Sequence, residues 1–185
     1  LTEKYDSEGE FLKLKSRLVV DGSKQDREAY DMDVSSPTVS CSSVYTVAAI
    51  ALKEGRHVMT GDVGGAFLNA FIPSGITIHV KLGSTNAALL CQIRPVYNKF
   101  LDHSGEMLVK LDKALYGCIM SARLWYDTFC SFLEKLGYTP NLRDGCVFNK
   151  VSDNGIQSTV LFHVDDVMAT CADKKMLKEL EDELL

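Results

Sequence analysis

Two apolar runs rich in β-branched residues lie between residues 156 and 172 and flank one adjacent acidic pair, Asp165-Asp166. Such runs predict strands, and an Asp-Asp pair suits a tight turn between them. The pattern therefore predicts a hairpin with two carboxylates at its tip, which repel each other unless a cation such as Mg²⁺ relieves them. The alternative is a solvated turn without chemistry, because aspartate is common in turns.

A second acidic position follows another short apolar stretch. Residues 57–61 predict a strand that ends at Asp62, and Gly64 and Gly65 predict a turn directly after it. Because Asp62 and Asp165 each end a strand, we expect them to meet at one edge of a sheet. Three converging carboxylates are the arrangement that two-metal phosphoryl transfer uses, with the ions about 3.5–4 Å apart.

The rest of the chain alternates between helical and strand-like periodicity. Serine caps and a glycine stop predict a helix from Ser40 or Ser42 to Gly55, and apolar residues at helical spacing predict another over 121–136. Further elements are expected as strands at 11–20, 76–81, 89–93, 107–111 and 146–151, loops at 98–105 and 138–145, a polar connection at 28–38, a hairpin turn at 152–155, and a helix capped by Asp173. This order predicts an α+β fold with helices packed on one face of an antiparallel sheet.

Composition narrows the class of protein. The chain has 185 residues, of which 46% are hydrophobic, so it is long enough for one well-cored domain. Its net charge of −5 argues mildly against general nucleic-acid binding, but the charge is uneven, with four acids within residues 179–183. Six cysteines without a Cys-X-X-Cys pair predict free, mostly buried thiols in a reducing compartment. Without a signal peptide or a membrane-spanning run, an intracellular location is expected, in the cytoplasm or the nucleus.

Five motifs in chain order resemble those of one enzyme family. Residues 62–69, Asp-Val-Gly-Gly-Ala-Phe-Leu-Asn, resemble the first catalytic motif of reverse transcriptases, and residues 162–167, Phe-His-Val-Asp-Asp-Val, are similar to their Tyr-X-Asp-Asp motif. Residues 111–126 resemble the Leu-Tyr-Gly-Leu-Lys-Gln-Ala-Pro-Arg-Ala-Trp-Tyr signature of copia-type retrotransposon enzymes, and residues 15–25 and 146–149 fit the same group. The chain is therefore identified as a member of the copia-type reverse transcriptases.

This resemblance implies a fold, a reaction and partners. The fold would be a reverse-transcriptase palm with a partial fingers region, in one domain fragment of residues 1–185, with fingers in 1–38, mainly palm in 39–185 and no thumb. The reaction would be RNA-directed DNA polymerisation, in which a primer 3′-hydroxyl attacks the α-phosphate of a dNTP with two Mg²⁺ or Mn²⁺ ions. The implied partners are an RNA or DNA template with its primer, dNTPs, and the thumb and RNase H parts of a polyprotein, without a membrane.

The resemblance also assigns roles to individual residues. The catalytic and metal-binding residues would be Asp62, Asp165 and Asp166, and His163 would lie at the primer end. Contacts to the dNTP would come from Lys15, Arg17, Val63, Gly64, Gly65 and Phe67.

Several of these roles have a plainer alternative. Lys15 and Arg17 suit triphosphate oxygens but also suit an ordinary solvated hairpin. Backbone amides of the glycine turn suit phosphate because glycine lets it approach closely. Phe67 would pack under the sugar and exclude a ribose 2′-hydroxyl, or it is a core residue that opens a short helix. Trp125 and Tyr126 are expected to pack in the core.

The chain departs from the family pattern at a few positions. His163 replaces the usual tyrosine, Ile119 and Met120 stand where the signature has Lys-Gln, and Ala122 stands where it has Pro. The three acids are kept, yet these changes leave a second function open: a decayed or co-opted retrotransposon remnant that binds nucleic acid or protein without polymerising. An unrelated Mg²⁺-dependent phosphotransferase would need a nucleotide motif such as a P-loop, and the sequence has none.

Overall fold

The hairpin predicted around the acidic pair is present in the computed structural model, which describes residues 2–26 and 33–184. Its strands, β8 (Gln157–His163) and β9 (Asp166–Cys171), pair antiparallel with His163 opposite Asp166. Val164 and Asp165 are therefore the two residues of the turn. The sequence predicted the hairpin correctly because both strands are apolar and β-branched, but the turn was expected at Asp165-Asp166 and lies one residue earlier, with Asp166 as the first residue of β9.

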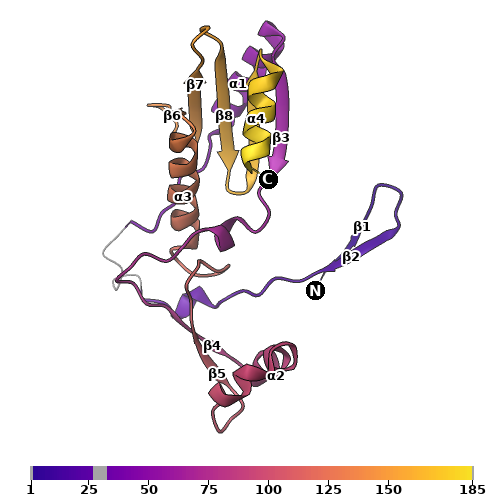
Figure 1. Cartoon of the computed structure of the whole chain (residues 1–185), viewed down its shortest axis with the longest axis vertical. Helices are drawn as coiled ribbons and strands as arrows, with labels where there is room; N and C mark the ends of the chain where they lie inside the picture. The colour runs from indigo at the N-terminus through magenta and orange to yellow at the C-terminus, as the bar shows by residue number, and fades with distance from the viewer. Residues whose placement is uncertain (1, 27–32, 185) are drawn as a thin grey trace. The chain divides into compact units, whose positions relative to one another are not determined.

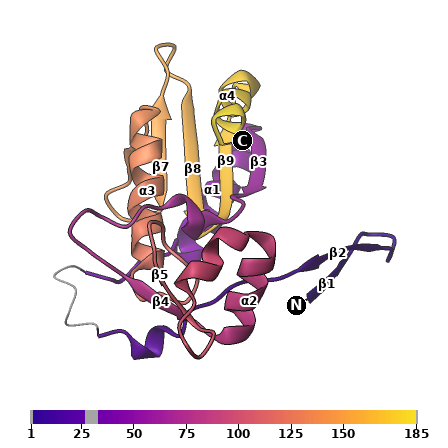
Figure 2. The ribbon, with the colours of Figure 1, turned by 60° about the horizontal axis from the view of Figure 1, so that its bottom comes forward.

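Three further strands extend the hairpin into a sheet. β7 (Val147–Val151) pairs with β8 across the predicted turn at 152–155, and the two-residue β6 (Thr139–Pro140) lies outside β7. β3 (His57–Asp62) pairs with β9 on the other side, and it ends at Asp62 as predicted. All pairs are antiparallel, and the strand order is β3-β9-β8-β7-β6. Figure 1 labels β6, β7, β8 and β3, and Figure 2 labels β9 between β8 and β3.

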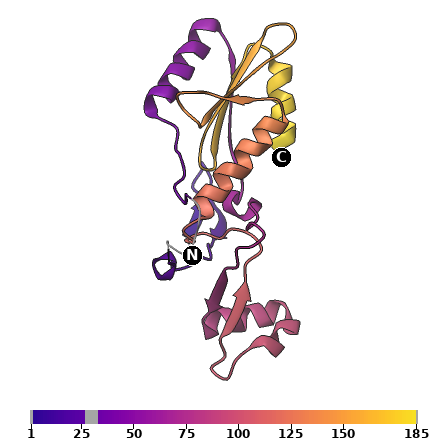
Figure 3. The same cartoon turned by 90° about the vertical axis from the view of Figure 1, so that its left-hand side faces the viewer.

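Helices cover both faces of this sheet, so the prediction that they pack on one face is wrong. Leu161 of β8 packs with Val147 and with Val47 of α1 (Cys41–Glu54) on one face. Its neighbour Phe162 points to the opposite face and meets Phe129 edge-on, with ring centroids 4.8 Å apart. Figure 3 shows α1 on one side of the sheet and α3 and α4 on the other. The physical reason is that residues 158–162 of β8 are all buried, and a strand that is buried on both faces requires a layer on each.

The helix ends follow the predicted caps. The Ser40 Oγ accepts the Ser43 N–H at 3.1 Å before α1, and Gly55 ends α1 in the left-handed region with φ 64°. The helix predicted over 121–136 is α3 (Ser121–Lys135), and the last helix is α4 (Lys174–Leu184). α4 lies along β9 and β3 (Figure 2), and the Cys171 Sγ approaches the Met176 Sδ at 3.8 Å.

A second group of elements forms its own compact unit, Leu1–Gln25 with Phe71–Cys118, separate from Asp26–Ala70 with Ile119–Leu185. It contains the hairpin of β1 (Thr2–Tyr5) and β2 (Phe11–Lys15), and the antiparallel pair of β4 (His79–Leu82) and β5 (Met107–Lys110). The predicted division into fingers at 1–38 and palm at 39–185 stays a prediction, and the compact units divide the chain at other residues.

Two sequence predictions in this unit are corrected. The strand expected at 89–93 is the end of a helix, α2 (Ser84–Ile93), because Ala87 and Cys91 lie one turn apart on its buried side. The loop expected at 98–105 begins within a 3₁₀ helix, Pro95–Phe100. Short apolar runs such as this one fit a strand or a helix equally well, and tertiary packing decides between them.

The Tyr116-Gly117 step of the copia-like signature has a structural role in the same unit. The Val20 N–H donates to the Tyr116 O at 2.8 Å. Gly117 has φ 90°, and a Cβ there would lie only 2.0 Å from the Val20 O. Only glycine allows these two backbone segments to approach so closely.

The remaining expectations concern connections and cysteines. Of the polar connection expected at 28–38, residues 28–32 lie outside the described residues, and 33–38 form neither helix nor strand. The cysteines are free, and four of the six are buried, as predicted. Within residues 2–26 and 33–184, no helix combines the length and the apolar character needed to cross a membrane.

Candidate catalytic site

Asp62 and Asp166 lie directly opposite each other on neighbouring strands. The β3–β9 register pairs Asp62 with Asp166, and the β8–β9 register pairs Asp166 with His163. Directly opposite residues of an antiparallel pair share a face, so these three form a row across one end of the sheet. All three are exposed. The strands that carry the predicted acids are thus neighbours, as expected.

Asp165 occupies the second position of the turn beside this row. Its predecessor Val164 has φ 59° and is the only non-glycine with a positive φ in the described part of the chain. Both turn carbonyls accept hydrogen bonds from outside the hairpin. The Trp125 Nε1–H donates to the Val164 O at 2.6 Å, and the Val63 N–H donates to the Asp165 O at 2.8 Å.

The donor chemistry of this end of the sheet fits a hard divalent cation, since carboxylate oxygens are the ligands that Mg²⁺ prefers. The backbone brings Asp62 and Asp166 onto one face and places Asp165 next to them. The side chains are not gathered around one point: across residues 2–26 and 33–184, no three His, Cys, Asp or Glu side chains are grouped closely enough to hold a metal ion. The fit therefore lies in residue type and backbone placement.

The glycine turn after Asp62 differs from its predicted role at one residue. The Val63 amide, expected at the triphosphate, donates to the Asp165 O instead, and the role of the Gly64 and Gly65 amides there stays a prediction. Gly65 takes φ 64° and begins the 3₁₀ helix Ala66–Asn69, which contains the half-buried Phe67. The short helix expected at this phenylalanine is confirmed, and its role at the sugar stays a prediction.

The two predicted phosphate contacts of the N-terminal segment lie in the other compact unit. Lys15 ends β2 and, with Thr2, Lys4 and Arg17, lines a hollow of about 310 Å³. The Arg17 guanidinium lies over the ring of Tyr116, 5.1 Å from its centroid. Both side chains are exposed, and their role at a triphosphate stays a prediction.

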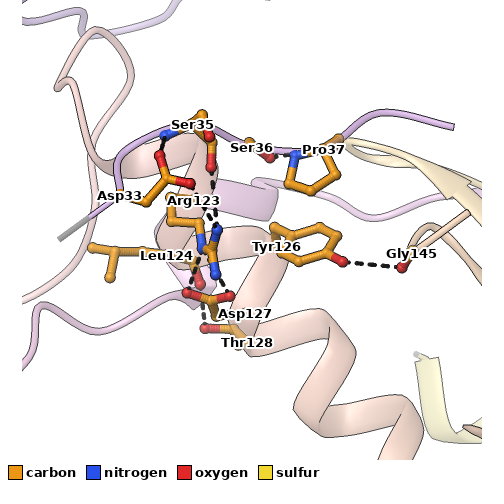
Figure 4. A network of polar contacts seen from close by, with 10 residues as sticks. All are labelled: Asp33, Ser35, Ser36, Pro37, Arg123, Leu124, Tyr126, Asp127, Thr128 and Gly145. Carbon is orange, nitrogen blue, oxygen red and sulfur yellow. Dashed lines mark hydrogen bonds and ion pairs between the residues drawn. The ribbon is translucent and has the colours of Figure 1, made fainter. Parts of the chain in front are cut away.

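Arg123, in the first turn of α3, makes polar contacts that the sequence did not predict (Figure 4). The Arg123 Nε donates to both carboxylate oxygens of Asp127, at 3.0 and 2.9 Å. Its Nη1 donates to the Ser35 O at 3.5 Å and lies 3.7 Å from the Asp33 carboxylate. The hydrogen bond to Asp127 raises the pKa of Arg123. Arg123 thus connects the segment before α1 to α3.

Trp125 packs in the core as predicted, whereas Tyr126 is only half-buried, with its ring centroid 5.9 Å from that of Phe162. The polar tips of both residues also reach other loops. Trp125 is 4% exposed and contacts the turn through the Val164 carbonyl. The Tyr126 hydroxyl donates to the Gly145 O at 3.1 Å (Figure 4), and burial raises the pKa of Tyr126. Only a general rule could have indicated these contacts from the sequence: a buried Trp or Tyr needs a hydrogen-bond partner for its N–H or O–H.

Asp144 is a further connection at this end of the sheet. Its Oδ2 accepts the Ser40 N–H at 3.0 Å and the Ser43 hydroxyl at 2.6 Å, and its Oδ1 accepts the Cys146 N–H at 3.0 Å. Partial burial pushes the pKa of Asp144 up, but these hydrogen bonds outweigh it and leave the pKa below its ordinary value. The carboxylate thereby joins the start of α1 to the loop before β7.

Comparison with known proteins gives a consistent result. The reverse transcriptase (RNA-dependent DNA polymerase) family matches residues 1–185. The chain is 30% identical over 183 residues to the retrovirus-related Pol polyprotein from transposon TNT 1-94 of Nicotiana tabacum, covering 98% of this chain and 12% of that protein. It is 27% identical over 183 residues to the Pol polyprotein from transposon RE1 of Arabidopsis thaliana, covering 99% and 11%. It is 28% identical over 171 residues to the transposon Ty1-BL Gag-Pol polyprotein of Saccharomyces cerevisiae, covering 92% and 8%.

The chain spans only 8 to 12% of the length of these relatives. No solved structure matches it. The family match extends over the whole chain, and it includes the strand ends that carry Asp62, Asp165 and Asp166. The chain therefore belongs to the reverse transcriptase (RNA-dependent DNA polymerase) family, as a copia-type reverse transcriptase domain.

Proposed function

We propose that this domain is the palm and partial fingers of an RNA-directed DNA polymerase, encoded within a retrotransposon polyprotein. The observation that carries the proposal is the strand register, which pairs Asp62 with Asp166 and places Asp165 in the adjoining turn. Three carboxylates at one end of a rigid sheet are the ligand set that nucleotidyl transfer uses. The template–primer and dNTPs would be its substrates, and the remaining polyprotein parts its partners inside the cell.

The proposed roles follow from where each residue lies. Asp62, Asp165 and Asp166 would hold two Mg²⁺ or Mn²⁺ ions, which when bound activate the attacking oxygen and neutralise charge on the leaving oxygen. The Gly64 and Gly65 amides would orient the triphosphate by donating to its oxygens. Little covalent chemistry falls to the protein, so positioning of the primer end and the dNTP accounts for most of the catalysis.

Other residues would set substrate choice and position. The Phe67 ring would lie under the sugar and exclude a ribose 2′-hydroxyl. His163 stands in the exposed row with Asp62 and Asp166, where its flat ring would pack at the primer end. Lys15 and Arg17 would donate charge-assisted hydrogen bonds to the triphosphate.

A second candidate is a retrotransposon remnant that binds nucleic acid or protein without polymerising. The observation in its favour is Met120, which is fully buried and apolar where the family signature has glutamine. A buried thioether offers only a weak acceptor and no donor to a nucleotide.

Mn²⁺ titration of the chain, followed by amide NMR, tests the first candidate. We expect Mn²⁺ to broaden the amide signals around the 163–166 turn. Asp62→Asn or Asp165→Asn should lower the apparent Mn²⁺ affinity by at least about 10- to 100-fold, the size of effect seen when even an outer-shell partner of a metal ligand is removed. Asp153→Asn is a matched control, because Asp153 is an exposed acid in the turn at the other end of β8. Equal binding in all variants, or no binding at the turn of a folded chain, would remove the proposed metal site.

Primer extension separates the two candidates. With an oligo(dT) primer on poly(rA), dTTP and Mg²⁺, the polymerase proposal expects extension in the native chain and in Asp153→Asn, and none in Asp62→Asn or Asp165→Asn. Mn²⁺ binding at the turn without extension would favour the remnant.

A further inference from the structure

The backbone of the Asp165 turn is in a conformation that its sequence disfavours. The two-residue turn has a β-branched valine, Val164, at φ 59°, in the left-handed region. In hairpins of this length, a first turn residue with positive φ is usually glycine or asparagine. For a β-branched residue the left-handed region is strained by about 1–2 kcal/mol. Such strain persists only where the surrounding structure over-determines it.

The surrounding structure supplies that constraint through Trp125. Its indole Nε1–H donates to the Val164 O at 2.6 Å, a contact between residues 39 positions apart. The indole itself is fixed, because it is 4% exposed and stacks on Phe129 with ring centroids 5.2 Å apart. Phe129 in turn meets Phe162 of β8 edge-on at 4.8 Å. The donor is therefore held in place by the core of the same unit.

A second hydrogen bond fixes the next carbonyl of the turn. The Val63 N–H, directly after Asp62, donates to the Asp165 O at 2.8 Å. Trp125 and Val63 thus hold two successive carbonyls from two different elements, α3 and the end of β3. With both carbonyls fixed, the peptide planes on either side of the Asp165 Cα are fixed, and so is the direction of the Cα–Cβ bond from which its carboxylate extends.

We infer that Trp125 is a positioning residue: its indole N–H fixes the left-handed Val164 turn and thereby sets the place of the Asp165 carboxylate. The inference rests on the proposed function only for the role of Asp165 as a metal ligand. It assigns to Trp125 a task separate from core packing, since packing uses the ring faces and the task uses the N–H.

The substitution that separates the two tasks is Trp125→Phe. It keeps an aromatic ring against Phe129 and removes the donor to Val164. Phe148→Leu is the matched control, because it disturbs the same aromatic cluster through Phe162, with ring centroids 6.2 Å apart, and keeps both the indole N–H and the Phe129 ring that holds it.

Amide hydrogen exchange provides a readout that needs neither metal nor activity. The Val63 amide reports on the turn through its bond to the Asp165 O, and the Ser152 amide, bonded to the Ile156 O at 2.9 Å, reports on the other end of β8. In Trp125→Phe, we expect Val63 exchange to accelerate about three- to tenfold relative to Ser152. In Phe148→Leu we expect the ratio of the two rates to stay as in the native chain.

Val164→Gly tests whether backbone strain at Val164 is the reason that the turn needs the Trp125 hydrogen bond. Glycine adopts positive φ without strain, so in a Val164→Gly background the effect of Trp125→Phe on Val63 exchange should fall below about twofold. An equal effect in both backgrounds would overturn this reason for the contact.

The affinity for Mn²⁺ tests whether fixing the turn affects the proposed metal site. The indole signal of Trp125 is the only one in the NMR spectrum, because the chain has one tryptophan, and its broadening by Mn²⁺ follows binding in the native chain and in Phe148→Leu. We expect Trp125→Phe, followed through the turn amides, to weaken Mn²⁺ binding about three- to tenfold, and Phe148→Leu to leave it unchanged. Absence of binding in the native chain would remove the proposed metal site, while the exchange experiment would still test the fixing of the turn. An unchanged exchange ratio in Trp125→Phe, or native binding that this variant does not weaken, would overturn the inference.

Discussion

The two hairpin turns at opposite ends of β8 are closed in different ways. At one end, turn residues 152–155 include Gly155 at φ 78°, and the Ser152 hydroxyl accepts the Ile156 N–H at 3.1 Å. The hydrogen bonds from the Ser152 N–H to the Ile156 O and from the Gly155 N–H to the Ser152 O also join residues within this turn or beside it. At the other end, Val164 takes a similar φ without being glycine, and its carbonyl is held by Trp125 from α3.

The difference separates a turn that its own sequence specifies from one that the rest of the unit imposes. Asparagine followed by glycine suits a tight turn without help. A valine followed by two aspartates does not, because its branched side chain disfavours positive φ and the acids repel each other. The end of the sheet that carries the three acids therefore depends on tertiary contacts, among them the Asp144 carboxylate that ties α1 to the loop before β7. Strain at the turn lies in the backbone of Val164, and it persists because contacts such as that of Trp125 over-determine the turn.

The largest effect on stability is expected for Asp144→Ala, which removes a connection at the end of the sheet that carries the three acids. Loss of the carboxylate leaves the Ser40 and Cys146 amides without their acceptor, and we expect the free energy of unfolding at pH 7 to fall by about 2 kcal/mol. Urea denaturation measures it. Asp153→Ala, in the locally closed turn, should change it by less than about 0.5 kcal/mol.

The Asp144 effect should also depend on pH. Because its folded pKa is lowered, its contribution is present above the ordinary aspartate pKa of about 3.9 and is lost as pH falls through the lower folded value. The difference between the native chain and Asp144→Ala should therefore shrink in denaturation series taken from pH 5 downward. A constant difference across that range would contradict an ionised acceptor.

Gly155→Val introduces into the turn at 152–155 the same kind of strain that Val164 carries, a β-branched residue at positive φ. The added Cβ has no neighbouring atom within 4 Å, so only the backbone conformation opposes it. Without a contact like that of Trp125, we expect a loss of about 1–2 kcal/mol in unfolding free energy. Asp153→Val controls for β-branching at a position without positive φ. A loss equal in both variants would mean that turn strain is not the cause.

Ser152→Ala removes the local closure of the same turn. The Ile156 N–H loses its hydroxyl acceptor at 3.1 Å, and we expect a loss of about 0.5–1 kcal/mol in urea denaturation. Ser104→Ala, in an exposed turn of the other compact unit, is a control in which the Ser152 and Ile156 amides should keep their exchange rates. Unaltered exchange of the Ile156 amide in Ser152→Ala would show that the hydroxyl does not close the turn.

Local patterns predicted what is locally determined. The strands that end at Asp62 and at the acidic pair follow from apolar β-branched runs, and the limits of α1 follow from a serine cap and a glycine stop. The register that places Asp62 opposite Asp166 was expected only as a meeting at one sheet edge, because register depends on packing of both faces.

Contacts between distant segments were beyond reach of the sequence alone. Nothing near Val164 indicates that it takes a positive φ, since the donor that fixes its carbonyl comes from Trp125, 39 residues away in the chain. The second helical layer was not predicted, although a continuous apolar run such as that in β8 is typical of a strand buried on both faces. The segment 89–93, expected as a strand, is helical for a related reason: burial of Ala87 and Cys91, one helical turn apart, favours the helix α2.

The smallest change in stability is expected for Val164→Gly, the reverse of the Gly155 substitution. Relief of left-handed strain stabilises the folded state by about 1–2 kcal/mol, while the greater freedom of glycine in the unfolded chain opposes it by roughly 0.5–1 kcal/mol. Loss of the half-buried valine side chain removes much of the remainder, so we expect the free energy of unfolding to change by less than about 0.5 kcal/mol. A large loss in urea denaturation would mean that the Val164 side chain, and not the carbonyl contact with Trp125, maintains the turn. A near-zero change would mean that the strain of this turn lies in the backbone of Val164 and that its side chain does not maintain the turn.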